Sequence, residues 1–597
     1  MLTLSDSKTH HLTLYPSLDE EYSMHTTTDS AVSTTSAVRP HAGSPSGDAG
    51  PATSSRAARP PSRRAFALGA AGAGTLAALS LTGCSNEGRG GAAVGDNTDA
   101  VFPAYVPFDG ITPDLKGKDG VSDAMLHYPE NPKKVTDGAP GDGKDVGVFT
   151  LSTNPVPPAL DKNDYWQELN KRLGFHLKVS VVPSDFADRF QTAIAGDRLP
   201  DIFAYFPGDV PSLPSMLAER AADLTSLLAG DAVTKYPFLA NIPTESWQSC
   251  VYGGKIYAIP IPRGGMQSTV MYSRKDLLDD EGLAVELDSL EDFMDSCKEL
   301  TGGKRWAIGG APTLFVREMF EIPNGWSEDG GKLTSANEDE RQQDALNAVR
   351  TMVKDGLLHP DSFTVDQPKR KTWVANGTTP LIQDTLTAWP DFSNYPLPDG
   401  FRLSVLQPAK ADGGGNAPIY HGPTAQNITS ISKKSEDRVE ALLSVLNYLA
   451  APFGSEEYKY KMFGIEGVDH ELKGSDPVLT EKGRTEVQLG LRYVGQGPWV
   501  NYSPGAPGVT KDQHDAEAAS VPTAVKNPTT GLYSETQSRK GNQIGSALGD
   551  IENDIIQGRK PVSAWSDAVE TWKKNGGDKM RDEYEKALAE AAESSQG

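Results

Sequence analysis

Between residues 145 and 205 the chain alternates short apolar runs with amphipathic segments, and this alternation limits the possible folds more than any other feature. Three apolar runs predict strands, at 145–151, 175–182 and 200–205. Two segments between them carry apolar residues at helical spacing, at 164–173 and 186–195. Gly174 closes the first of these helices. Strand–helix–strand–helix–strand predicts a parallel sheet with right-handed crossovers.

The remaining chain is long enough to form a second lobe. With 597 residues the chain exceeds what one compact core accommodates. Further strands are predicted at 255–261, 270–273, 305–308, 379–384 and 402–407. Helices are predicted near 288–300, 339–355, 366–376, 436–450, 542–558 and 561–590. Because ligands of open parallel sheets sit at the carboxyl ends of the strands, the loops after the strands are the places to search for a site.

The first 83 residues predict an export signal. Residues 1–61 are rich in Ser, Thr, Ala, Pro and His, and Arg63-Arg64 then precede an uncharged Gly/Ala/Leu stretch that ends at Cys84. That stretch is too short and too glycine-rich for a stable membrane-spanning helix. The pattern resembles a bacterial twin-arginine signal peptide ending in a lipobox, which implies that Cys84 carries the lipid and becomes the first residue after cleavage. The alternative is a buried Ala-rich helix with a fortuitous cysteine.

Charge and residue usage exclude several classes of function. The formal net charge of −23 would be repelled by phosphate backbones, so nucleic-acid binding is not expected. The histidines are scattered, no pair has metal-ligand spacing, and no P-loop is present. We therefore expect neither a metal nor a cofactor. Outside the signal, Cys250 and Cys297 could form a disulfide or could both be small buried core residues.

Five short motifs follow one another in order along the rest of the chain. They are residues 255–260 (KIYAIP) followed by 270–278 (VMYSRKDLL), 323–326 (PNGW) followed by 329–333 (DGGKL), 355–361 (DGLLHPD), 463–470 (FGIEGVDH) and 572–584 (WKKNGGDKMRDEY). Together they resemble the family 1 extracellular solute-binding proteins of carbohydrate ABC transporters, above all the aldouronate- and oligosaccharide-type lipoproteins. The resemblance covers most of the chain after Cys84.

The resemblance implies an α/β, bilobal periplasmic-binding-protein type II fold, with two hinged lobes built from interleaved segments. We expect a lipid tether and extended arm at 84–143, a first lobe from 144–261 with about 405–450, and a second from 262–404 with about 451–597. It also implies a monomer without enzyme activity, anchored by lipid to the outer face of the cell membrane. This monomer would capture a sugar, expected to be an oligosaccharide, and deliver it to ABC permease subunits.

Sugars are bound by aromatic faces that stack on pyranose C–H groups and by planar polar side chains that satisfy hydroxyls. Position in the predicted fold selects seven candidates, namely Asn154, Tyr205, Phe206, Arg263, Trp326, Trp499 and Tyr502. The resemblance adds Asp384, Trp389 and Asn427. Alternatives remain open: Tyr205 or Phe206 could cap the core, Arg263 could form a surface salt bridge, and the Trp and Tyr residues in Pro/Gly-rich loops could simply pin those loops.

Three other functions compete with this interpretation. An exported carbohydrate-active enzyme would use two carboxylates, and pairs are inevitable among 80 acidic residues. A lipoprotein with a purely structural role in the cell wall is the second. The third keeps the binding fold but takes a peptide or another solute as ligand.

Overall fold

The structure is a computed structural model that describes Asn97 and residues 100–594, apart from Asp137, Thr153, Pro155, residues 265–267 and Thr424. The chain separates into two compact units, residues 1–87 and 88–597, and every described residue belongs to the second unit. The predicted signal and Cys84 lie outside the described residues. No helix in the described part is long and apolar enough to cross a membrane.

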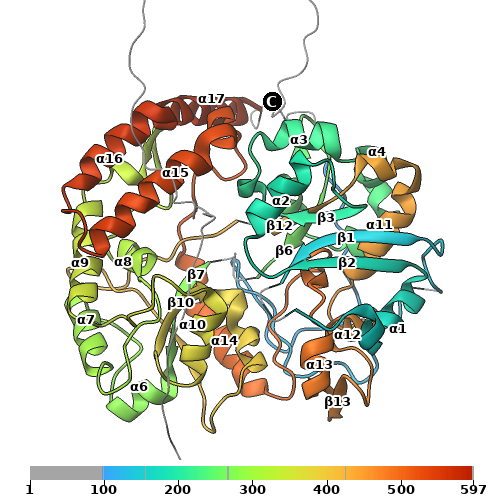
Figure 1. Cartoon of the computed structure of the whole chain (residues 1–597), viewed down its shortest axis with the longest axis horizontal. Coiled ribbons are helices and arrows are strands. Elements are labelled where there is room, and N and C mark those ends of the chain that lie inside the picture. Colours follow the sequence, from blue (N-terminus) through green and yellow to red (C-terminus); the bar gives the residue numbers. More distant parts are fainter. Residues whose placement is uncertain are drawn as a thin grey trace, which may run out of the picture. The chain divides into compact units, whose positions relative to one another are not determined.

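The described structure has two halves in space, each built from several segments of the chain. The half that the chain enters first, called the first half below, is built on a five-stranded sheet with the order β2-β1-β3-β12-β6 (Figure 1). Its strands are β1 (Asp145–Leu151), β2 (His176–Val182), β3 (Ile202–Tyr205), β6 (Ile259–Pro262) and β12 (Ala425–Ile431). Strand β1 runs parallel to β2 and β3, which confirms the predicted parallel sheet in this region. Strand β12 runs antiparallel to β3 and β6, so the complete sheet is mixed.

Helices of the first half follow from short sequence signals. They are α1 (Asp164–Leu173), α2 (Phe186–Ala195), α3 (Leu213–Arg220), α4 (Thr225–Leu228), α5 (Pro237–Ala240), α11 (Val439–Leu449), α12 (Glu456–Phe463) and α13 (Glu481–Glu486). The side chain of Asn163 caps α1 by accepting from Trp166 N, and Gly174 ends it in the left-handed conformation. The apolar faces of α1 and α2 pack on the sheet through Leu169 and Phe190, which are fully buried.

Residues 453–502 belong to the first core, whereas the sequence led us to expect them in the second lobe. Phe453 packs on Tyr128 at 4.8 Å between ring centroids, and Tyr460 stacks on Tyr165 at 5.5 Å. These aromatic contacts bury a segment whose sequence position alone suggested the other lobe. The small sheet of β13 (His470–Lys473) and β14 (Asp476–Leu479) lies within the same segment.

The second half is built on a three-stranded antiparallel sheet with the order β10-β7-β11. The strands are β7 (Thr269–Arg274), β10 (Leu381–Thr385) and β11 (Leu403–Leu406). Side chains alternate across β7: Met271 enters one apolar core, while Val270 and Tyr272 enter another. The predicted strand at 305–308 does not form. Ile308 instead makes isolated bridges to Leu358 and Leu381.

Helices cover the second half and end the chain. They are α6 (Lys275–Glu281), α7 (Leu290–Glu299), α8 (Thr313–Met319), α9 (Gln342–Lys354), α10 (Gln367–Ala375), α14 (Pro507–Ser520), α15 (Glu535–Ile556), α16 (Ala564–Trp572) and α17 (Asp578–Ser594). Two hairpins complete the structure: β4–β5 (Val251–Tyr252 with Lys255–Ile256) and β8–β9 (Trp326–Asp329 with Lys332–Ser335). Cys250 lies in the first core and Cys297 in the second, and both are free buried thiols.

The chain crosses between the halves three times, after β6, between β11 and β12, and before α14. The first crossing begins at Gly264, where the backbone runs tightly past its neighbours. A Cβ atom on Gly264 would lie 2.1 Å from Trp499 Cδ1 and 2.3 Å from Ser122 Oγ. Only glycine permits this approach without displacing them.

Candidate functional site

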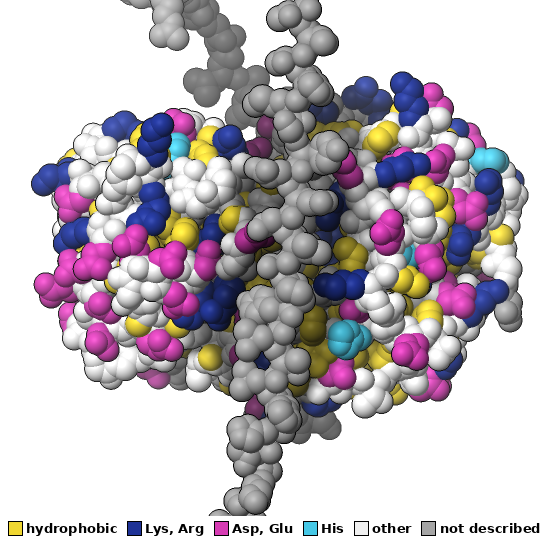
Figure 2. Space-filling model, turned by 90° about the horizontal axis from the view of Figure 1, so that it is seen from below, with side chains coloured by type: hydrophobic (Ala, Val, Ile, Leu, Met, Phe, Trp, Pro, Cys, Tyr) yellow, Lys and Arg dark blue, Asp and Glu magenta, His cyan; other side chains and the backbone are white. Residues whose placement is uncertain are grey.

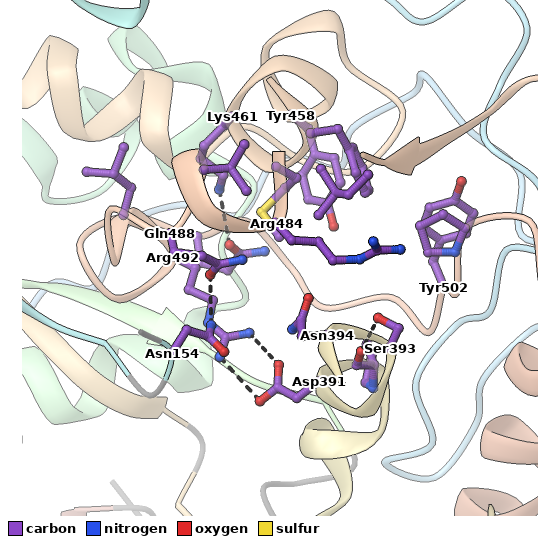
Figure 3. Close-up of a pocket in the computed structure, with 18 of the residues that line it drawn as sticks. Asn154, Asp391, Ser393, Asn394, Tyr458, Lys461, Arg484, Gln488, Arg492 and Tyr502 are labelled. Atoms are coloured by element: carbon purple, nitrogen blue, oxygen red, sulfur yellow. Dashed lines mark hydrogen bonds and ion pairs between the residues drawn. The ribbon is translucent and has the colours of Figure 1, made fainter. Parts of the chain in front are cut away.

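A pocket lies where side chains from the two halves meet. One cavity of about 200 Å³ is lined by side chains of the first half, among them Asn154, Tyr458, Gln488 and Trp499, and by Pro390, Asp391, Ser393 and Asn394 of the second half (Figure 3). A second cavity of about 100 Å³ adjoins it, because the two share Arg263, Asp391, Arg492, Tyr493 and Trp499 as lining residues.

The second half contributes one acidic group at the junction of the cavities. Asp391 lies in the 3₁₀ segment η7 (Leu386–Asn394), which follows β10 and is anchored by the buried rings of Trp389 and Phe392. Asp391 Oδ1 accepts from Arg492 Nη1 at 2.9 Å, and its Oδ2 lies 3.2 Å from Lys371 Nζ. Burial alone would raise the pKa of the Asp391 carboxyl, but Arg492 and Lys371 together outweigh burial and hold it well below its usual range.

Lys371 sits between two carboxylates. It belongs to α10, and its Nζ lies 3.3 Å from Asp384 Oδ2 as well as 3.2 Å from Asp391 Oδ2. Burial lowers the pKa of Lys371, and the two carboxylates outweigh burial and raise it. Both carboxylates are thus ion-paired. The pKa of the Asp391 carboxyl is held below its usual range, whereas the general acid of a glycosidase needs a raised pKa.

Arg492 belongs to the first half and its ion pair with Asp391 therefore crosses between the halves. It lies in the 3₁₀ segment η9 (Leu491–Tyr493), whose Leu491 is buried in the first core. The crossing pair is visible as dashed lines in Figure 3. Because both partners are largely removed from solvent, this pair is positioned to hold the halves together.

Arg263 is a second arginine in the same place and has different partners. Its guanidinium donates to two backbone carbonyls, Pro262 O at 3.2 Å and Arg492 O at 3.5 Å. It also lies over the rings of Tyr493 and Trp499, at 5.5 and 5.8 Å from their centroids. Among the described residues Arg263 has no carboxylate within ion-pair distance. Burial and the charge of Arg492 lower the pKa of its guanidinium to about 10, so it stays cationic at neutral pH.

Lys461 is a buried ammonium in the wall of the larger cavity. Its Nζ donates to Leu449 O at 2.7 Å, Gln496 Oε1 at 3.0 Å and Gly495 O at 3.2 Å. These three acceptors use all three N–H groups and none of them is charged. Burial, followed by the charge of Arg263, lowers the pKa of Lys461 to about 7.

Aromatic and amide side chains complete the larger cavity. Tyr502 donates its hydroxyl to Asp476 Oδ1 at 2.8 Å, and Trp499 donates Nε1 to Asn501 Oδ1 at 3.0 Å, which fixes both rings. Asn154, in the loop after β1, donates to Gln488 Oε1 at 2.7 Å. Figure 3 shows Tyr502, Asn154, Gln488 and the extended Arg484 side chain around one space. Rings next to amides and cations are the groups that pyranoses and their substituents bind.

The structure brings five of the ten candidates from the sequence to the two cavities. Asn154, Arg263, Trp499 and Tyr502 line the larger one, and Asp384 lines the smaller one. Four others are buried elsewhere. Tyr205 lies in the first core, Trp326 packs against Trp572 and Tyr584, and Trp389 packs against Tyr272. Asn427 is buried and donates its Nδ2 hydrogen bond to Tyr493 O. Phe206 packs edge-on against Phe186 and lines neither cavity.

Sequence reasoning did not select several residues that line the cavities. They are Lys371, Asp391, Lys461, Arg484, Gln488 and Arg492. Four of the six lie in segment 461–492, which we had expected in the second lobe. One signal was available for Lys461, because it lies three residues after Tyr458 on α12 and therefore shares the buried face of that helix. Among the described residues no group of His, Cys, Asp or Glu is arranged to hold a metal ion.

Comparisons with known proteins agree with this geometry. Residues 159–453 match the family model described as "Bacterial extracellular solute-binding protein". The lipoprotein LipO of Bacillus subtilis is 24% identical over 495 residues, covering 76% of this chain and 94% of LipO. The polygalacturonan/rhamnogalacturonan-binding protein YtcQ of the same organism is 22% identical over 454 residues, covering 71% of this chain and 88% of YtcQ.

The fold is also found among solved structures. The N-glycan transport solute-binding protein NgtS of Streptococcus pneumoniae, solved in complex with Man1GlcNAc, superposes with a TM-score of 0.56 at 16% identity. The match covers 75% of this chain and 99% of that one. At this identity the likeness shows the fold, with two lobes of mixed helix and sheet.

Proposed function

Because residues 159–453 match the model of the bacterial extracellular solute-binding proteins, we propose that the chain captures an oligosaccharide between its two halves and presents it to the permease of an ABC importer. One observation carries the choice of a sugar: the larger cavity combines tyrosine and tryptophan rings with amides and cations. The similarity to YtcQ, a polygalacturonan/rhamnogalacturonan-binding protein, and to NgtS, an N-glycan transport solute-binding protein, supports the same choice.

Binding would require the halves to move. The two cavities, about 200 and 100 Å³, are each smaller than the roughly 300–1,000 Å³ typical of ligand pockets. An oligosaccharide would therefore enter while the Arg492–Asp391 pair is separated, and the crossings between the halves would act as the hinge. Closure would then exclude water from the sugar and re-form the pair.

Direct binding tests this proposal. The purified full-length chain is titrated with a panel of oligosaccharides, and both heat release and tryptophan emission are recorded. Because Trp499 lines both cavities, we expect saccharide binding to change the emission, and Trp499→Phe to reduce that change. Trp306→Phe is the matched control, since Trp306 packs on His359 and lines neither cavity. Recovery of cleaved sugar, or a panel in which no saccharide binds, would overturn the proposal.

Location is the second part of the proposal. The family and the lipoprotein relative support a place outside the cytoplasm, and we propose that a lipid on Cys84 keeps the protein at the outer face of the membrane. Growth with a radiolabelled fatty acid should label the protein, and Cys84→Ala should abolish the label and release the protein from the membrane fraction. An unlabelled protein that still sediments with membranes would contradict the lipid anchor.

A further inference from the structure

The two cavities carry more positive than negative side chains. Five cations line them (Arg263, Lys371, Lys461, Arg484 and Arg492), against two carboxylates (Asp384 and Asp391). This excess occurs in a protein whose formal net charge is −23. Figure 2 shows that Asp and Glu side chains are spread over one face of the described part among Lys and Arg. The charge of the cavities therefore does not follow from the composition of the chain.

Both carboxylates are already neutralised by two of the cations. Lys371 lies 3.2–3.3 Å from Asp384 and Asp391, and Arg492 lies 2.9 Å from Asp391. Two negative charges thus meet two positive ones within one network. The surplus consists of Arg263, Lys461 and Arg484.

None of the three surplus cations has a carboxylate within ion-pair distance in the described part of the chain. The hydrogen bonds of Arg263 and Lys461 go to backbone carbonyls and to the amide of Gln496, which are neutral acceptors. Arg484 is exposed and extends across the larger cavity in Figure 3. Lys461 is buried and Arg263 is partly buried, and withdrawing like charges from water is unfavourable unless an anion compensates them. Arg484 remains in contact with solvent and adds a third positive charge to the same cavity.

The guanidinium groups indicate what kind of anion fits. A guanidinium presents parallel N–H donors that match two oxygens of one oxyanion, whether a planar carboxylate or a tetrahedral sulfate ester. Arg263 also carries Tyr493 and Trp499 beside it, so a pyranose could stack on a ring while its charged substituent meets the guanidinium. Lys461, whose N–H groups are all used, would act through its charge without touching the ligand.

We propose that the ligand is an anionic oligosaccharide, whose carboxylate or sulfate ester is bound by Arg263 and Arg484 in the larger cavity. This inference rests on the proposed function and specifies the substrate class of the same site. Uronate carboxylates and sulfate esters share the recognised chemistry, an oxyanion on a pyranose ring. Neutral oligosaccharides of the same backbone would leave the three surplus cations uncompensated and would bind more weakly.

Matched pairs of ligands test the charge alone. Uronate oligosaccharides of several backbones (galacturonate, mannuronate and glucuronate-substituted xylan) are each compared with their methyl esters, and sulfated oligosaccharides with their desulfated forms. We expect at least one acidic member to bind ten or more times more tightly than its neutral partner. The arm in which this occurs identifies the oxyanion. Neutral sugars that bind as tightly as every acidic partner would overturn the inference while leaving the proposed function intact.

Charge-removing variants locate the contact. Arg263→Gln and Arg484→Gln should each weaken binding of the acidic ligand about tenfold and leave its neutral partner within twofold. Arg539→Gln is the control, because it removes one positive charge from the exposed surface of α15, where Arg539 pairs with Glu535. Melting temperatures show whether Arg263→Gln folds, and Arg484→Gln keeps the test valid if it does not. Equal loss of acidic and neutral ligands in both variants would overturn the assignment.

Discussion

The two halves contribute opposite charges to the two adjoining cavities. We call the lining residues of each half one wall of the pocket. The wall from the first half presents Arg263, Lys461, Arg484 and Arg492, and none of its described lining residues is a carboxylate. The wall from the second half presents Asp384 and Asp391, with Lys371 between them. One cation and one anion, Arg492 and Asp391, pair across the boundary.

This difference separates two tasks that charged groups perform in one site. Arg492 and Arg263 are near neighbours, and Arg263 even donates to the Arg492 carbonyl. Arg492 finds its counter-ion on the opposite wall and therefore contributes to closure. In the described part of the chain Arg263 contacts neutral acceptors and aromatic rings, and we propose that its charge serves the ligand.

The largest effect is expected from Asp391→Asn. The change removes the negative charge of Asp391 from both Arg492 and Lys371. Breaking a buried ion pair from one side costs roughly 3 kcal/mol. We expect the free energy of unfolding to fall by about that amount, as measured by urea denaturation. Asp515→Asn breaks the exposed Lys511–Asp515 pair and should change stability by less than about 0.5 kcal/mol.

The acid side of the stability profile gives Asp391 a second signature. Its pKa is lower in the folded protein than its usual value, so the unfolded chain binds more protons as pH falls below about 4. The stabilisation by Asp391 is therefore complete above that pH and is lost as pH falls toward the depressed folded pKa. Asp391→Asn should flatten this part of the profile. If the loss of stability at acid pH is the same in Asp391→Asn as in the unmodified protein, Asp391 does not stabilise the closed arrangement of the halves.

The next largest effect is expected from Gly264→Ala, which acts on both walls. The added Cβ would meet Trp499 Cδ1 at 2.1 Å and Ser122 Oγ at 2.3 Å, so the Trp499 ring must move. Overpacking of this kind costs about 2 kcal/mol, and we expect ligand affinity to fall with stability. Gly208→Ala is the matched control, because no atom lies within 4 Å of the added Cβ. If both variants melt at the temperature of the unmodified protein, the crossing is looser than the structure implies.

Lys461 should make binding and stability depend on pH in opposite directions. An anionic ligand prefers the charged ammonium, so affinity should fall as pH rises through about 7. Tyr458, whose ring lies 5.5 Å from the Nζ atom, and Arg263 are the titratable neighbours, and the other groups around Lys461 are neutral acceptors. We expect a decrease of no more than about tenfold between pH 6 and pH 9, equivalent to 1.4 kcal/mol. Titration calorimetry at several pH values measures it.

The stability profile checks the same group without a ligand. The pKa of Lys461 is about 7 when folded and about 10.4 when unfolded. Between these values the unfolded chain binds more protons, so the contribution of Lys461 to stability rises with pH across this window and is constant below it. Lys461→Met should remove both the rise in stability and the fall in affinity. If the rise in stability or the fall in affinity persists in Lys461→Met, another titratable group causes that pH dependence.

Sequence patterns predicted the elements of the first half better than the walls of the pocket. The alternation at 145–205 specifies strands and helices through local periodicity, and β1, α1, β2, α2 and β3 follow it closely. Positions after these strands also located Asn154, and the chain crossing located Arg263. The places of these residues depend on the local sequence around them, and local periodicity therefore predicts them.

The rest of the site depends on packing between distant segments. Segment 453–502 joins the first half through Tyr128 and Tyr165, more than 290 residues away along the chain. No periodicity reveals that choice, and with it Lys461, Arg484, Gln488 and Arg492 were missed. The aromatic candidates Tyr205 and Trp389 illustrate the converse, because a ring after a strand can fill a core as readily as a pocket.

The smallest effect is expected within one wall, at the hydrogen bond from Asn154 to Gln488. Asn154→Ala removes one neutral bond at the rim of the larger cavity without touching either charge network. Such a bond is worth about 1 kcal/mol, so affinity should fall no more than about fivefold, and acidic and neutral ligands should lose equally. Gln488→Ala should match it, and the double variant should lose no more than either single one if the pair acts as a unit. Selective loss of the acidic ligand in Asn154→Ala would instead mean that the amides, and not the surplus cations, recognise the charge.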